Sequence, residues 1–141
     1  MKLKSFFSAG FLALLLTACG SQHNFSQSDL PAELYQGYWA MHPIDDVHRV
    51  VRFNPTSAVT IYDYTCNGRS DDYRLNETET VYLSVLAKNS FSLLDNKKQP
   101  FARFDIVKAN AQYLQAKQRF NEGGPTLNLH YRHLIGSKPI C

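Results

Sequence analysis

The chain has 141 residues, of which 15 are basic and 12 acidic, and its formal net charge is +3. This length suits one domain, and the content of hydrophobic residues (44%) and aromatic residues (13%) allows a packed core and argues against disorder. Lys2 and Lys4 lie at the extreme N-terminus, so the other 13 basic residues (15 − 2) almost balance the 12 acidic ones. Such a near-neutral domain argues against nucleic acid as a partner.

Residues 1–18 have the pattern of a cleaved signal peptide. The early lysines supply the positive start, residues 6–16 form an apolar stretch, and the small residues Thr17 and Ala18 precede the expected cleavage site. The apolar stretch is shorter than the roughly 20 residues that a membrane-spanning helix needs. We therefore expect this segment to be removed and to play no part in the fold.

The signal ends in Leu-Thr-Ala-Cys at positions 16–19, which resembles the lipobox of bacterial lipoproteins. The resemblance implies that Cys19 begins the mature protein and carries diacylglycerol on its sulfur and an acyl chain on its amino group. Several acyl chains hold a membrane far more tightly than one, at about 0.8 kcal/mol per buried methylene. No Asp stands beside the cysteine, which in this family implies the outer membrane, facing the periplasm. An ordinary secretory signal is the alternative.

Residues 19–28 are small and polar and predict a flexible, lipidated tether. A short helix is expected over 28–36, because Asp29 can accept backbone N–H groups at a helix start, Pro31 fits a first turn, and Gly37 fits a C-terminal stop. This helix is too short to form a core, so we expect it to dock on the domain or cover it.

From Trp39 onward, short segments of alternating apolar and polar residues lie between turn signals and predict seven or eight β-strands. The expected strands cover 47–53, 58–66, 73–75, 80–86, 91–94, 101–107, 112–120 and 126–134. For 109–120 a helix is the alternative, because Ala, Gln, Leu and Lys are good helix formers. The regular spacing predicts an all-β domain over residues 29–141, either a small antiparallel β-barrel or a sandwich.

Gly37, Tyr38 and Trp39 resemble the Gly-x-Trp signature at the first strand of lipocalins and of smaller lipocalin-like domains. In that family an N-terminal helical turn plugs one end of the barrel, and the tryptophan packs against an arginine late in the chain. The resemblance implies a lipocalin-like barrel with Trp39 and Arg132 as its closing pair. A guanidinium over an indole ring contributes roughly 0.5–2 kcal/mol. A core tryptophan of another β fold is the alternative.

If Cys19 carries the lipid, two of the three cysteines are left to pair with each other. Cys66 and Cys141 then remain, and paired thiols outside the cytoplasm persist as disulfides. We predict a Cys66–Cys141 bridge, which would stabilise the fold by roughly 3–5 kcal/mol through loop-closure entropy. Two free thiols, or contacts with a partner chain, are the alternatives.

The sequence contains no Gly-x-Ser-x-Gly elbow, no His-Glu-x-x-His pair and no phosphate-binding loop. Four residues of one loop, His42, Asp45, Asp46 and His48, could supply metal ligands, but polar loop residues are usually just solvated. We therefore expect neither a metal nor a cofactor, and a protein that is not an enzyme.

The expected function is binding or scaffolding, with an envelope protein or a small apolar ligand as the partner. Nine phenylalanines favour a barrel filled with side chains over an open cup. The segment 64–66, Tyr-Thr-Cys, is similar to the Tyr-x-Cys segment of C-type lysozyme inhibitors, which are also small lipidated β-barrels with disulfides, although here it follows two other strands. This similarity makes inhibition of a hydrolase such as lysozyme the alternative function.

Overall fold

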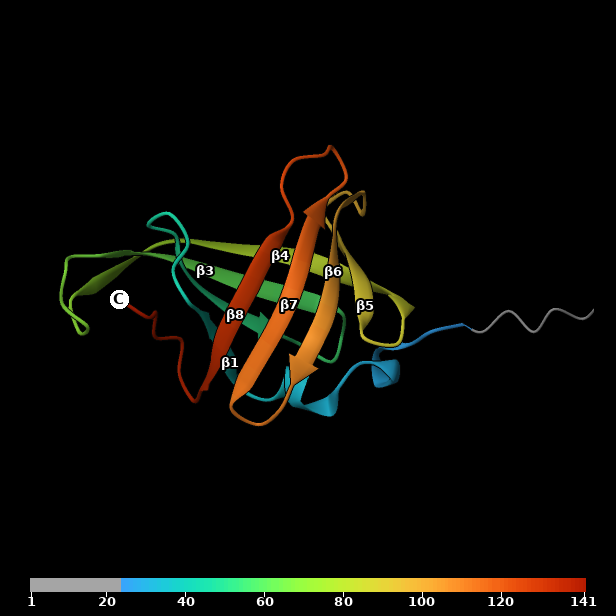
Figure 1. The fold of residues 1–141 in the computed structure, drawn as a ribbon, viewed down its shortest axis with the longest axis horizontal. Coiled ribbons are helices and arrows are strands. Elements are labelled where there is room, and N and C mark those ends of the chain that lie inside the picture. The colour runs from blue at the N-terminus through green and yellow to red at the C-terminus, as the bar shows by residue number, and fades with distance from the viewer. Residues whose placement is uncertain (1–23) are drawn as a thin grey trace, which may run out of the picture.

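A computed structural model describes residues 24–141 as one antiparallel β-sheet that closes into a barrel (Figure 1). Two short 3-10 helices, η1 (Gln27–Asp29) and η2 (Ala32–Tyr35), precede the eight strands. The strands are β1 (Tyr38–Met41), β2 (His48–Phe53), β3 (Ala58–Cys66), β4 (Tyr73–Ala87), β5 (Ser90–Leu94), β6 (Pro100–Ala109), β7 (Tyr113–Phe120) and β8 (Leu127–Leu134). The prediction of a small all-β antiparallel barrel after a short helical segment is confirmed.

Each strand pairs with the next one along the chain, and β1 pairs with β8 to close the ring. This is the order of an up-and-down barrel, in which closure removes the open edges of the sheet. The expected strands at 73–75 and 80–86 form one long strand, β4. Its first half runs with β3 beyond the body of the barrel, toward the C-terminus (Figure 1).

The segment 109–120 contains the strand β7, so the helical alternative is wrong. β7 pairs with β6 on one side and with β8 on the other. Its inward residues Leu114 and Ala116 are buried, whereas Lys117 is exposed. The helix propensity of single residues is only a weak preference. Here it is overridden by backbone hydrogen bonds to a strand on each side and by the burial of every second side chain.

Phenylalanine rings fill the middle of the barrel. Phe53, Phe91 and Phe104 are at most 2% exposed, and their ring centroids lie between 4.8 and 6.2 Å apart. Aromatic pairs in such stacked and tilted arrangements contribute about 0.5–1.5 kcal/mol beyond the burial of their area. The middle of the barrel is therefore filled, as the phenylalanine content suggested.

The two 3-10 helices plug one end of the barrel. Leu30 and Leu34 belong to the interior cluster, and Nε1 of the buried Trp39 donates a hydrogen bond to the Leu34 carbonyl at 2.9 Å. The expected continuous helix over 28–36 is instead two turns separated by extended residues. Pro31 explains the break, because proline donates no N–H and disfavours helical geometry in the residue before it.

Trp39 packs against His133 and not against Arg132. Trp39 lies directly opposite His133 on the β1–β8 ladder, and their ring centroids are 5.2 Å apart. Residues directly opposite each other point to the same face of a sheet. Arg132 is the neighbour of His133 and therefore points outward, where it is exposed. The predicted closing pair of Trp39 and Arg132 is wrong.

Gly37 lies where only glycine fits without strain. Its φ is +64°, and a Cβ there would lie 2.7 Å from His133 Nε2 and 2.8 Å from the Leu134 carbonyl oxygen. The glycine therefore allows the chain to turn from η2 into β1 in close contact with the end of β8.

The C-terminal segment after β8 is tied to the outer face of the barrel. Cys66 and Cys141 form a disulfide, which confirms the predicted bridge. The Tyr64 hydroxyl donates a hydrogen bond to the Ser137 carbonyl, which fixes the middle of the segment. The segment packs with a second, smaller cluster, whose buried members are Ala40, Val50 and Tyr64.

The predicted signal peptide, the lipid attachment at Cys19 and the start of the tether lie outside the described residues. Of the expected tether over 19–28, residues 27 and 28 belong to η1. Among residues 24–141, no helix has the length and apolar character needed to cross a membrane.

Candidate functional site at the mouth of the barrel

The barrel is hollowed at the end opposite to the 3-10 helices. Two adjoining hollows of about 150 and 280 Å³ share the side chains of Arg49, Gln118, Phe120 and Tyr131. In Figure 1 the β7–β8 loop stands at this end, at the top, while η2 lies at the bottom. We call the two hollows together the mouth.

The walls of the mouth are mainly apolar, and Phe53 and Phe104 lie beneath them as a floor. Most of these side chains occupy alternate, inward positions along the strands, so the pattern that builds the core also builds the walls. A concave apolar site with few polar groups is the usual form of a small-molecule site. The apolar lining includes Met41, Ile44, Val51, Val59, Ile61, Val81, Leu93, Phe101, Leu127 and Leu129.

The Tyr131 hydroxyl is a hydrogen-bond donor that the described protein leaves unused. Tyr131 is 4% exposed and lines both hollows. Within residues 24–141 its hydroxyl has no hydrogen-bond partner. Burial raises the pKa of Tyr131 far above its ordinary value, and the opposing effect of the Arg49 charge is smaller. The hydroxyl is therefore protonated at neutral pH and can donate to a ligand.

Arg49 borders both hollows, but its charge is already compensated. Its Nε and Nη2 donate to the two carboxylate oxygens of Asp63 at 2.7 and 2.8 Å. The two residues lie directly opposite each other on β2 and β3, so the strand register builds the pair. The hydrogen bonds that Arg49 donates to Asp63 raise the pKa of Arg49, and burial acts in the opposite direction. A bidentate pair holds the guanidinium in place, and Arg49 is thus a fixed rim residue.

Negative charge exceeds positive charge at the mouth. Glu79 lines one hollow and Asp45 the other, and neither forms a salt bridge with a residue in the described range. Arg49 is the one basic residue among the described residues that line the mouth, and Asp63 already pairs with it, so an anionic ligand would meet uncompensated repulsion. The mouth therefore suits an uncharged, largely apolar molecule that carries a hydrogen-bond acceptor.

Three of the four loop residues considered as metal ligands, Asp45, Asp46 and His48, have other roles. Asp45 and Asp46 are the central residues of a tight turn bridged by Ile44 and Val47, and their φ angles are 47° and 62°. Two positive φ angles are what a type I′ hairpin turn requires, and Asp tolerates them better than most residues. The acidic pair is explained by the turn.

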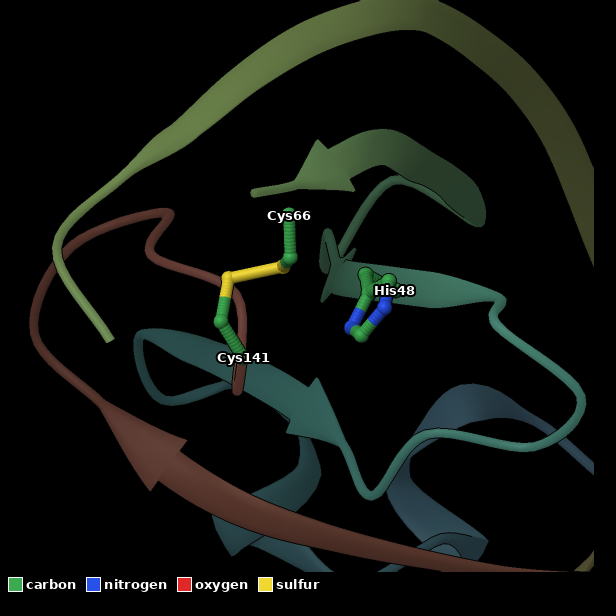
Figure 2. Close-up of side chains that lie close together, drawn as sticks. All are labelled: His48, Cys66 and Cys141. Atoms are coloured by element: carbon green, nitrogen blue, oxygen red, sulfur yellow. A yellow bond between two sulfur atoms is a disulfide. The ribbon is translucent and has the colours of Figure 1, made fainter. Parts of the chain in front are cut away.

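His48 points away from that turn, toward the C-terminal segment (Figure 2). Its Nδ1 lies 2.9 Å from the carbonyl oxygen of Ile140 and donates to it, because a carbonyl can only accept. The ligand atoms of His48, Cys66 and Cys141 lie within 4.8 Å of one another. Both sulfurs are bonded in the disulfide and offer no thiolate, so the bridge accounts for this grouping.

Sequence reasoning missed the polar residues of the mouth. Arg49 did carry a signal, because it is in phase with the inward residues Val51 and Phe53, and a charged residue at an inward position indicates the rim of a barrel. Tyr131 alternates with the polar residues of its strand and so reads as an inward residue, but nothing local to it indicates that its hydroxyl ends in a hollow. That property depends on strands far apart in the chain.

Comparison of the chain with protein-family models, curated proteins and solved structures found no significant match.

Proposed function

We propose that this protein is a lipid-anchored lipoprotein of the bacterial outer membrane that binds a small, uncharged, largely apolar molecule in the mouth of its barrel. The main support for this class of ligand is the protonated Tyr131 hydroxyl, which faces an apolar hollow and has no acceptor among the described residues. One polar group in an apolar pocket typically fixes the orientation of a ligand and provides specificity. The proposed role is capture or carriage and includes no catalytic step.

The position of the N-terminus supports an orientation for this binding. The described chain begins at Asn24 and reaches the barrel through η1, at the plugged end (Figure 1). A lipid on Cys19 would hold the plugged end toward the membrane. The mouth would then face the periplasm, where a ligand can enter it.

The anchor is tested by replacing the cysteine of the lipobox-like segment. We expect Cys19→Ser to abolish lipid labelling and to move the protein from the membrane fraction to the soluble fraction, because the sulfur is the attachment atom. Metabolic labelling with a palmitate analogue, followed by fractionation, measures both effects. Ser21→Ala, two residues away, is the control and should keep the label. A label that persists in Cys19→Ser would contradict the anchor.

The mouth is tested with N-phenyl-1-naphthylamine, an uncharged apolar dye that fluoresces when it leaves water. We expect saturable binding to the lipid-free Cys19→Ser protein. Phe120→Ala should weaken this binding about fivefold, equivalent to roughly 1 kcal/mol of lost apolar contact. Tyr113→Ala is the matched control, since Tyr113 is an exposed aromatic residue of the same strand that does not line the mouth.

Competition with aliphatic molecules then tests the role of Tyr131. We expect 1-decanol to displace the dye, and Tyr131→Phe to weaken displacement by decanol about fivefold by removing one hydrogen bond. Decanoate should compete less well than decanol, because acidic residues surround the mouth. Equal dye binding by Phe120→Ala and by the parent protein, or a preference for decanoate, would overturn the proposed site.

A further inference from the structure

The first half of β4 has one edge without a neighbouring strand. β4 pairs with β3 from Tyr73 to Tyr82, but β5 ends opposite Tyr82, at Leu94. In the sheet formed by residues 24–141, nothing pairs with the other edge of residues 73–81. All residues from Arg74 to Thr80 are exposed, and Figure 1 shows this part of β4 extending beyond the barrel.

The backbone of this edge directs hydrogen-bonding groups to solvent. The amide of Leu83 donates to the Ser57 carbonyl, on the β3 side of the strand. Successive residues of a strand direct their N–H and C=O groups to opposite sides, and the β3–β4 register is regular between Leu83 and Glu77. Thr80 and Thr78 therefore direct their backbone groups away from β3. An added strand can therefore pair through its backbone with Thr78 and Thr80, in the way that β5 pairs with Tyr82.

The side chains of the edge carry a net negative charge, because it holds two glutamates against one basic residue, Arg74. Glu77 and Glu79 lie on the face that also carries Asp63 and Ile61, because these residues are directly opposite on β3. Asp63 is neutralised by Arg49 at 2.7 Å, whereas neither glutamate has a salt bridge with a described residue. The two glutamates are two positions apart, so they match cations at alternate positions of an added strand.

The same charges disfavour a second copy of this chain as the added strand. When two copies pair antiparallel with full overlap of residues 73–81, Glu77 of one chain lies opposite Glu77 of the other. Like charges in directly opposite positions destabilise a sheet, and charged residues are a common protection of open edges against self-pairing.

We infer that the β4 edge over residues 73–81 is a docking site for an extended segment of a basic protein, which adds to the sheet as a strand. Backbone hydrogen bonds to Thr78 and Thr80 would supply affinity, as in other cases of strand addition. Lysine or arginine at two alternate positions would pair with Glu77 and Glu79 and set the register. This site adjoins the mouth, because Glu79 and Val81 line one hollow, whereas Glu77, Thr78 and Thr80 do not line either hollow.

The experiment uses the lipid-free Cys19→Ser protein and a fluorescein-labelled peptide of alternating lysine and threonine. Fluorescence anisotropy should show saturable binding, and hydrogen exchange should show new protection of the Thr78 and Thr80 amides. Two further peptides carry N-methyl groups on one or the other alternate set of backbone amides. One of them should bind about tenfold more weakly, because its methyl groups face β4 and block hydrogen bonds, while the other should bind as before.

Variants of the protein separate the edge from general charge attraction. Glu77→Gln should weaken peptide binding about two- to fivefold, whereas Asp71→Asn, which removes an equal charge from the exposed β3–β4 turn, should leave it unchanged. If Glu77→Gln and Asp71→Asn weaken binding equally, or if both methylated peptides bind equally well, the peptide binds by general charge attraction. Either result would overturn the inference. Dimerisation of the protein alone with protection of Thr78 and Thr80 would overturn it in favour of a second copy.

Discussion

Replacing Cys66 with serine is expected to lower the free energy of unfolding by about 4 kcal/mol, through the loss of a closed loop in the unfolded chain. The bridge spans a sequence separation of 75 residues, so its loss frees a large part of the unfolded chain. It also releases the C-terminal segment from the outer face of the barrel. Denaturant unfolding monitored by circular dichroism measures the change.

Several controls bear on this prediction. Cys141→Ser should cost as much as Cys66→Ser, and the double variant should cost no more than either, because all three remove the same bridge. Cys66→Ser should also leave a Cys141 thiol that reacts with a maleimide. Two reactive thiols at Cys66 and Cys141 in the unreduced parent protein would contradict the bridge.

Replacing Trp39 with alanine is expected to lower the free energy of unfolding by about 3–5 kcal/mol, the usual cost of removing a large buried ring. Trp39 is fully buried, holds the Leu34 carbonyl at 2.9 Å, and contacts the His133 ring. The substitution therefore opens a cavity and also detaches the plug. Thermal unfolding should be monitored by circular dichroism and not by tryptophan fluorescence, because Trp39 is the one tryptophan of the chain.

Two further substitutions divide this loss into its causes. Trp39→Phe keeps an aromatic ring and loses the hydrogen bond, so it should cost less than Trp39→Ala. Arg132→Ala should change stability by less than about 0.5 kcal/mol, as exposed positions generally do. A larger loss from Arg132→Ala than from Trp39→Phe would contradict the observed packing of Trp39 against His133.

Much of the fold could be predicted from local pattern. The alternation of Val59 and Ile61 with polar neighbours predicts the strand β3, and the turn residues between 95 and 100 predict the break between β5 and β6. Such patterns are informative because side chains of a strand alternate between two faces, so burial of one face leaves a period of two in the sequence. The cysteine pair was also predictable, since it depends on residue types and compartment.

Long-range register was not predictable in the same way. The resemblance to lipocalins pairs Arg132 with Trp39, although the alternation within β8 already places Arg132 on the outer face, opposite to the inward Tyr131. The length of β4 was missed because its first half is polar on both faces, and exposed strands carry no hydrophobic period. The mouth was missed because Arg49, Tyr131 and Phe120 belong to three different strands.

Local pattern in the sequence predicts the all-β class, most of the strands and turns, and the anchor at Cys19. Each of these follows from interactions among near neighbours or from residue chemistry. Three features become apparent only in the folded chain: the eight strands close in chain order, the Tyr131 hydroxyl in the mouth has no partner within residues 24–141, and β4 extends beyond β5. These features arise from the register between distant strands, and a shift of one residue in register would send every side chain of a strand to the other face.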